Sequence, residues 1–129
     1  MSLRTRKAGL TIGILIALLG CNQDSWADVA ASDWVVSDYD RIRLISSGTN
    51  AGNQAALGIQ IKLEPGWKTY WRAPGESGIP PRFDWTKSQN LESIEVLWPA
   101  PQRYASYGLE TIGYKAEVVF PLVAKTRVA

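Results

Sequence analysis

A repeated alternation of apolar and polar side chains, with a period of two residues, constrains the fold of this chain more than any other feature. Ile42 and Leu44 alternate with Arg41 and Arg43, and the same pattern recurs in residues 59–63, 67–72, 94–98 and 117–122. Successive side chains of a strand point to opposite faces of a sheet, so the pattern predicts half-buried antiparallel strands. No stretch has the 3.6-residue period of a helix, and the sequence therefore predicts an all-β chain.

Prolines and glycines separate these predicted strands. Residues 64–66 (EPG) predict a tight turn, and residues 73–81 (APGESGIPP) predict a loop, because proline supplies no N–H donor to a ladder. We expect a short strand at 82–85, a second loop at 99–108 and a last strand within 114–128, where Pro121 indicates a sheet edge. Alternatively, residues 106–114 form a tight hairpin with tyrosines at its ends. Short strands with such turns predict a β-sandwich.

The first 27 residues are typical of an export signal. Arg4, Arg6 and Lys7 precede an uncharged stretch at 8–20, which is too short to span a bilayer comfortably. Two cleavage sites stay open: before Cys21, as in a lipoprotein signal whose cysteine is acylated, or after Ala27, as for ordinary signal peptidase. We therefore divide the chain into a signal at 1–27, a spacer at 28–33 and a sandwich at 34–129.

Composition excludes several classes of function. The chain has 14 basic and 12 acidic residues; three of the basic ones and Asp24 precede residue 28, which leaves 11 of each and a neutral body. A neutral body argues against nucleic acid as the partner. Histidine is absent and Cys21 is the only cysteine, so we expect no metal, no cofactor and no thiolate nucleophile in the exported body. The spacing of Glu76 and Asp84 does not identify an acid–base pair.

The aromatic stretch at 66–85 has two readings, a binding groove or the inside of a β-domain. We expect Trp67, Trp71 and Trp98 to lie in the core, because such rings are usually buried. Tyr70, which shares a strand face with Lys68, is the better surface candidate.

Three longer segments carry a resemblance to a known family. They are 63–85 (LEPGWKTYWRAPGESGIPPRFDW), 96–104 (VLWPAPQRY) and 113–122 (GYKAEVVFPL). In that order they resemble the periplasmic N-terminal domain of the DsbD protein-disulfide reductases and their ScsB-like relatives, over roughly residues 34–125. The resemblance implies an immunoglobulin-like antiparallel β-sandwich in the periplasm. It also implies a domain that accepts electrons from a membrane-embedded partner domain and passes them to periplasmic thiol-disulfide proteins.

The resemblance also implies where the site lies. In this family a cysteine pair on a hairpin downstream of the VVFPL region does the chemistry, and a loop with aromatic residues shields it. Residues 104–108 resemble that loop: Tyr107 and Gly108 match it, Tyr104 begins it, and Ser106 stands where an aromatic cap is expected. Tyr70, Trp71 and Arg72 resemble the strand beside the active site.

This chain departs from the family pattern at its end, because Ala129 precedes the point where the cysteine pair is expected. We therefore expect a sandwich incomplete at its C-terminus, with a last strand that lacks a partner, and a chain that is inactive alone. Contact with a membrane would come only through a lipid anchor at Cys21 or a missing downstream domain. The alternatives are a secreted or lipid-anchored binding module that uses exposed aromatics for glycan or peptide, and a structural envelope lipoprotein.

Overall fold

The computed structural model describes residues 30–49 and 52–127, and in these residues it contains strands and no helix. This confirms the all-β prediction. The nine strands are β1 (Ala30–Ala31), β2 (Val35–Val36), β3 (Asp40–Thr49), β4 (Gln54–Leu63), β5 (Lys68–Gly75), β6 (Leu91–Val96), β7 (Gln102–Ser106), β8 (Leu109–Lys115) and β9 (Glu117–Thr126).

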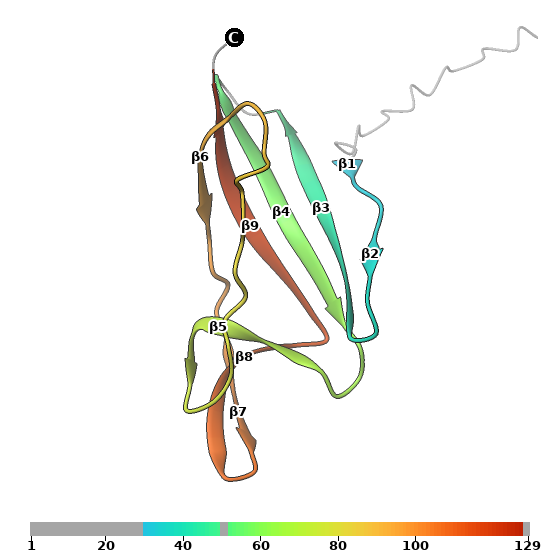
Figure 1. Cartoon of the computed structure of the whole chain (residues 1–129), viewed down its shortest axis with the longest axis vertical. Coiled ribbons are helices and arrows are strands. Elements are labelled where there is room, and N and C mark those ends of the chain that lie inside the picture. The colour runs from blue at the N-terminus through green and yellow to red at the C-terminus, as the bar shows by residue number, and fades with distance from the viewer. Residues whose placement is uncertain (1–29, 50–51, 128–129) are drawn as a thin grey trace, which may run out of the picture.

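The strands form two antiparallel sheets in an immunoglobulin-like sandwich. The larger sheet has the order β1-β3-β4-β9-β6, with β2 also paired to β3, and the smaller sheet has the order β5-β8-β7. Figure 1 shows the smaller sheet at one end of the larger one, with the β7–β8 hairpin projecting farthest. The segment between β5 and β6 runs in front of the larger sheet in this view.

A one-residue corner joins the two sheets. β8 ends at Lys115 and β9 begins at Glu117, and Ala116 between them has a φ of 62°. Such a positive φ turns the chain sharply, so that consecutive strands enter different sheets. The β7–β8 hairpin is therefore joined directly to β9, the strand that carries most of the buried core residues.

The core lies against the inner face of β9. Val118, Phe120, Leu122 and Ala124 are all buried there, at the alternate positions that the period-two pattern predicts. Phe120 is completely buried and meets three rings edge to face. These are Phe83 at 5.6 Å, Trp98 at 5.2 Å and Tyr114 at 5.4 Å between ring centroids. Aromatic pairs favour this arrangement, which joins β8, β9 and two loop segments into one cluster.

Two expectations about β9 are wrong. Pro121 does not mark an edge, and the last strand does not lack a partner, because β9 pairs with β4 on one side and β6 on the other. The Pro121 carbonyl accepts the Leu97 N–H at 2.8 Å, just beyond the end of β6. Pro121 therefore lies just past the end of the β6–β9 ladder, where its missing N–H costs no ladder hydrogen bond. For this reason a paired strand tolerates the proline.

Two further expectations about local structure are wrong. Residues 82–85 are not a strand: the Asp84 carboxylate accepts the Thr86 N–H at 2.9 Å, which lowers the pKa of Asp84, and local turns replace the ladder. Residues 102–106, placed in a loop at 99–108, are strand β7 and pair with β8. The alternative hairpin reading of residues 106–114 is the correct one.

The prediction for the tryptophans is correct for two of three. Trp71 and Trp98 are half-buried and pack against the core, whereas Trp67 is 48% exposed. Trp67 lies at the end of the turn before β5 and packs on Tyr39, itself 50% exposed, with centroids 4.1 Å apart. A turn position lies outside the alternation of the strand, which is why the pattern misplaced this ring.

Candidate functional site

The tip of the β7–β8 hairpin presents one aromatic side chain to solvent. Its two turn residues, Tyr107 and Gly108, have φ values of 52° and 78°, and two consecutive positive values are what a type I′ hairpin turn requires. Tyrosine rarely adopts this conformation. The turn holds Tyr107 fully exposed, at 105% of its reference area. The tip therefore carries a large exposed ring on a backbone conformation that is unfavourable for tyrosine.

Strand β5 pairs with β8 on the side opposite β7, and it contains a large bulge. Tyr70 pairs with Gly113 and Gly75 with Thr111, so residues 71–74 stand opposite Ile112 alone. A bulge of this kind redirects side chains. Trp71 turns to the core, and the exposed Arg72 lies 5.0 Å from the centroid of the Trp71 ring. Gly113 allows the two strands to approach, because a Cβ there would lie 2.2 Å from the Thr69 carbonyl oxygen.

The loop after β5 fastens Tyr70 in place. A Cβ on Gly78, whose φ is 112°, would meet the Tyr70 ring at 2.3 Å, so the ring packs directly on the glycine backbone. Glu76 ties the same loop to β8, since its carboxylate accepts the Glu110 N–H at 2.6 Å and its own N–H donates to the Glu110 carbonyl at 2.9 Å. Tyr70 is thus half-buried between a strand and a fastened loop.

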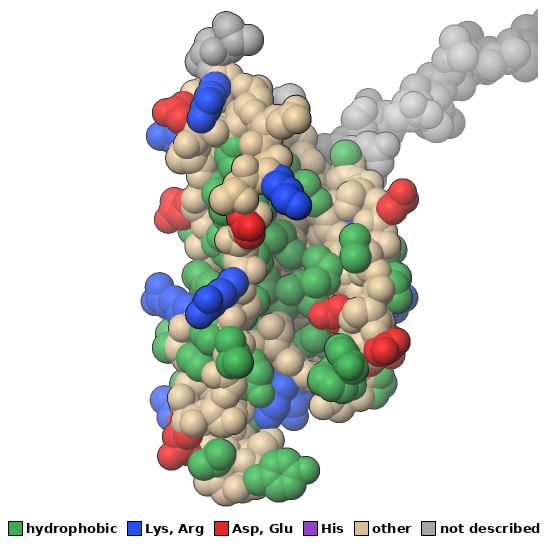
Figure 2. Space-filling view, in the orientation of Figure 1, with side chains coloured by type: hydrophobic (Ala, Val, Ile, Leu, Met, Phe, Trp, Pro, Cys, Tyr) green, Lys and Arg blue, Asp and Glu red, His purple; other side chains and the backbone are tan. Residues whose placement is uncertain are grey.

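A cavity of about 410 Å³ lies between β5 and the β7–β8 hairpin. Its lining residues are Gly66, Lys68, Tyr70, Ser77, Ser106, Tyr107, Leu109, Thr111 and Lys115. The Lys68 ammonium donates to Ser106 Oγ at 2.9 Å and to Thr111 Oγ1 at 3.2 Å. Thr111, only 2% exposed, donates in turn to the Tyr104 carbonyl at 3.3 Å. Figure 2 shows hydrophobic side chains at this end of the molecule and Lys or Arg side chains just above its tip.

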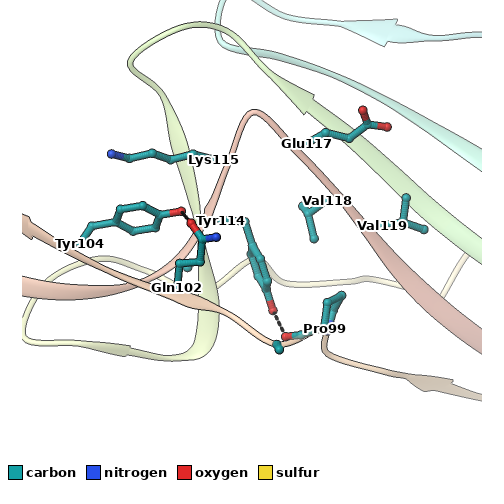
Figure 3. A pocket seen from close by; sticks show the side chains of 10 residues that line it. Pro99, Gln102, Tyr104, Tyr114, Lys115, Glu117, Val118 and Val119 are labelled. Carbon is teal, nitrogen blue, oxygen red and sulfur yellow. Dashed lines mark hydrogen bonds between the residues drawn. The ribbon is translucent and has the colours of Figure 1, made fainter.

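A second cavity, of about 310 Å³, adjoins the first: Lys115 lines both cavities, and Tyr104 lines the second. Figure 3 shows Lys115 extended beside the Tyr104 ring, and its ammonium lies 4.2 Å from the ring centroid. The Tyr114 hydroxyl, on the inner side, donates to the Pro99 carbonyl at 2.8 Å. Burial raises the pKa of Tyr114, and the positive charge of Arg72 opposes that shift.

The structure brings together some of the residues that the sequence singled out. Tyr70, Ser106 and Tyr107 line one cavity, Tyr104 borders it, and Gly108 completes the turn beside it. Trp71 and Arg72 lie in the bulge and do not line that cavity. Cys21 lies outside the described residues.

Sequence reasoning missed Lys68 and Lys115 as members of the site. The placement of Lys68 on the same strand face as Tyr70 was the available signal. Nothing in the sequence indicated that Lys115 would lie opposite Lys68.

The site presents rings, hydroxyl groups and ammonium groups, which can bind and orient a ligand. Residues 30–49 and 52–127 contain no cysteine and no histidine, and they hold no group of three acidic, histidine or cysteine side chains that could bind a metal. Within the same residues, no helix is long and apolar enough to cross a membrane. A disulfide exchanged here needs sulfur from elsewhere, because exchange requires a thiolate to attack a disulfide.

The fold is a β-sandwich domain that carries a hairpin tip and an aromatic strand side by side at one end. Residues 40–128 match the family model described as thiol:disulfide interchange protein DsbD, N-terminal, and the chain belongs to that family. The chain also resembles the N-terminal periplasmic domain of ScsB from Proteus mirabilis, with 34% identity and a TM-score of 0.64. That match covers 75% of this chain and 39% of the ScsB chain, so this chain spans about two-fifths of its length. No curated protein sequence matches significantly.

Proposed function

We propose that this chain is a docking domain of a periplasmic thiol:disulfide interchange system. The β7–β8 tip and the neighbouring Tyr70 receive a thiol-disulfide protein, and cysteines outside residues 28–129 carry the electrons. The observation on which this rests is the fully exposed Tyr107 on a hairpin turn beside a cavity. Family membership supplies the class of chemistry.

The geometry of Tyr107 supports docking in particular. A tyrosine has few side-chain torsions to order on binding and offers a large contact area, so the exposed Tyr107 is an efficient anchor. Trp71, Trp98 and Phe83 are half-buried and pack against the core, so they offer a partner less surface than the fully exposed Tyr107 does. A ligand that approaches this end of the domain meets Tyr107 and Leu109 first, since both are exposed.

We infer that the chain works in the periplasm and does not reduce disulfides alone. The similar ScsB domain is periplasmic, and residues 1–27 have the composition of an export signal. Electrons reach the site, in this proposal, from a membrane-embedded donor domain. Residues 28–129 have no cysteine with which to accept them, because Cys21, the one cysteine of the sequence, lies in the first 27 residues.

A titration tests the docking proposal. Isotope-labelled full chain is mixed with a panel of periplasmic proteins that carry a reactive cysteine pair, and amide shifts are followed by NMR. We expect at least one member to shift Tyr107, Gly108 and Tyr70. Tyr107→Asn removes the ring and keeps a residue that tolerates positive φ, and it should weaken that binding about tenfold.

Val35→Ala is the matched control, because Val35 is 74% exposed but lies in the larger sheet, on β2. It should leave the binding unchanged. The proposal is wrong if no panel member shifts the tip, or if Val35→Ala weakens binding as much as Tyr107→Asn does. In a separate assay, the full chain should not accelerate the reduction of insulin disulfides by dithiothreitol.

A further inference from the structure

Two lysines stand directly opposite each other at the floor of the β5–hairpin cavity. Lys68 on β5 and Lys115 on β8 are register partners, and both line the cavity. Like charges directly opposite each other on neighbouring strands destabilise a sheet. The fold therefore accepts a local electrostatic cost at this position, and such conflicts tend to mark functional sites.

Both ammonium groups are held in place by neighbouring groups. Each lies within 5.7 Å of the Tyr104 ring centroid, Lys115 at 4.2 Å and Lys68 at 5.7 Å. Lys68 also donates to the hydroxyls of Ser106 and Thr111. An ammonium has three N–H donors, so Lys68 keeps one free. The Lys68 ammonium is consequently oriented before any ligand arrives, and the exposed Lys115 ammonium lies against the Tyr104 ring.

Neither ammonium has an acidic partner in the part of the chain that the structure describes. The one ion pair there joins Arg103 and Glu110. The Glu76 carboxylate is also engaged, because it accepts the Glu110 N–H. The cavity thus offers two ammonium groups with free N–H donors and no ion pair to a described carboxylate, in about 410 Å³ of space.

We propose that this cavity is a subsite for a carboxylate, carried by an acidic side chain of the protein that docks on the tip. The proposal rests on the docking function proposed above and adds the charge that a partner presents beside its contact with Tyr107. A carboxylate would accept from Lys68 and Lys115 together and would relieve their mutual repulsion.

The test uses two probes that differ only in charge, acetyl-Gly-Glu-Gly-amide and acetyl-Gly-Gln-Gly-amide. Each is titrated into labelled full chain at low salt, and NMR follows the lysine side chains, the Tyr104 ring and the Ser106 amide. We expect the Glu peptide to shift these signals in a saturable way and the Gln peptide to leave them unchanged. Added salt should weaken the effect, because it screens exposed charges.

Variants separate binding from folding. Lys115→Met tests one charge without disturbing the fold, because its ammonium makes no hydrogen bond to a described residue and the Lys68 bonds stay in place. This single variant should also bind the Glu peptide more weakly than wild type does. The Lys68→Met, Lys115→Met double variant should bind the Glu peptide about tenfold more weakly. The control is the double variant Lys87→Met, Lys125→Met, which removes the same charge away from the cavity and should bind normally.

Equal binding of both peptides overturns the proposal, and so does unchanged binding by the Lys68→Met, Lys115→Met variant. The docking function can survive this failure: a panel protein that engages Tyr107 equally well in wild type and double variant supports docking and rejects the carboxylate subsite. Conversely, saturable Glu-peptide binding with no panel protein on the tip rejects the assignment of the carboxylate to a docking protein.

Discussion

Tyr114 and Phe120 meet edge to face across the corner where β8 becomes β9, with centroids 5.4 Å apart and ring planes at 87°. This contact joins the strand that carries the site to the strand that carries the core. Tyr114 is 6% exposed and Phe120 is fully buried. This pair is therefore a direct packing contact between the core and the strand that carries the site.

Replacement of Phe120 by alanine tests how much of the fold depends on this cluster. The variant removes a buried ring that contacts Phe83, Trp98 and Tyr114. Such a substitution leaves a cavity, and we expect the free energy of unfolding to fall by about 3–5 kcal/mol. Denaturant unfolding followed by tryptophan fluorescence measures it. Leu97→Ala is the control, because Leu97 is 42% exposed, and it should cost much less. A similar loss in both variants would contradict the central role of Phe120.

The titration of Tyr114 gives a prediction about pH. Its pKa is raised from 10.0, chiefly because burial disfavours the phenolate. A raised pKa means that the unfolded chain ionises first as pH increases. The stability contributed by Tyr114 is therefore complete below about pH 10 and is lost as pH rises through the raised value.

Tyrosinate absorbance measures this directly, with Tyr114 expected to ionise above its ordinary pKa of 10.0. Tyr114→Phe should cost about 1 kcal/mol near neutral pH, from the lost hydrogen bond to Pro99. The same variant should lose less stability than wild type between neutral and alkaline pH. A steeper alkaline loss in the variant would show that the sign is wrong.

Sequence reasoning succeeded where burial on one face of a strand decides the structure. The alternation of Ile59, Ile61 and Leu63, and of Val118, Phe120 and Leu122, placed β4 and β9 correctly, because the core fixes which face is apolar. The resemblance placed Tyr107 and Gly108 in a common segment, and the structure puts them in one turn.

Sequence reasoning failed where contacts between residues distant in the sequence determine the structure. Pro121 suggests an edge when only its own missing donor is considered, but the end of β6 accommodates it. Lys68 and Lys115 are 47 positions apart, and only the β5–β8 register brings them together. Local composition carries no information about such a register, so the two-lysine cavity could not be derived from it.

Gly78→Ala should disturb the site more than the core. The new Cβ would overlap the Tyr70 ring at 2.3 Å, so the ring must swing away from the loop. Gly66→Ala is the matched control: its φ of 87° imposes a similar backbone strain, but nothing lies within 4 Å of its Cβ. We expect both variants to lose about 1 kcal/mol of stability. Only Gly78→Ala should shift the NMR signals of the Tyr70 ring. Unchanged Tyr70 signals in that variant would show that the ring does not pack on Gly78.

Two kinds of surface interaction can be compared within this chain, the cation–π contacts of Trp34 and the Arg103–Glu110 ion pair. The guanidinium of Arg43 lies 4.4 Å from its ring centroid, and Arg41 and Lys62 lie at 5.8 Å and 5.6 Å. Trp34→Leu removes the ring face that these cations share, and we expect a loss of about 1–2 kcal/mol. Arg103→Ala instead breaks an ion pair with Glu110 whose side chains are 74% and 52% exposed. Solvent screening makes such a pair worth at most about 1 kcal/mol.

Unfolding of the two variants in low and high salt completes this comparison. Arg103→Ala should approach wild-type stability as salt rises, because the pair it lacks is screened in both proteins. The half-buried Trp34 also contributes apolar contact, so Trp34→Leu should remain less stable than wild type at every salt concentration. If high salt restores Trp34→Leu fully, the ring acts through charge alone, and the packing part of this argument is wrong.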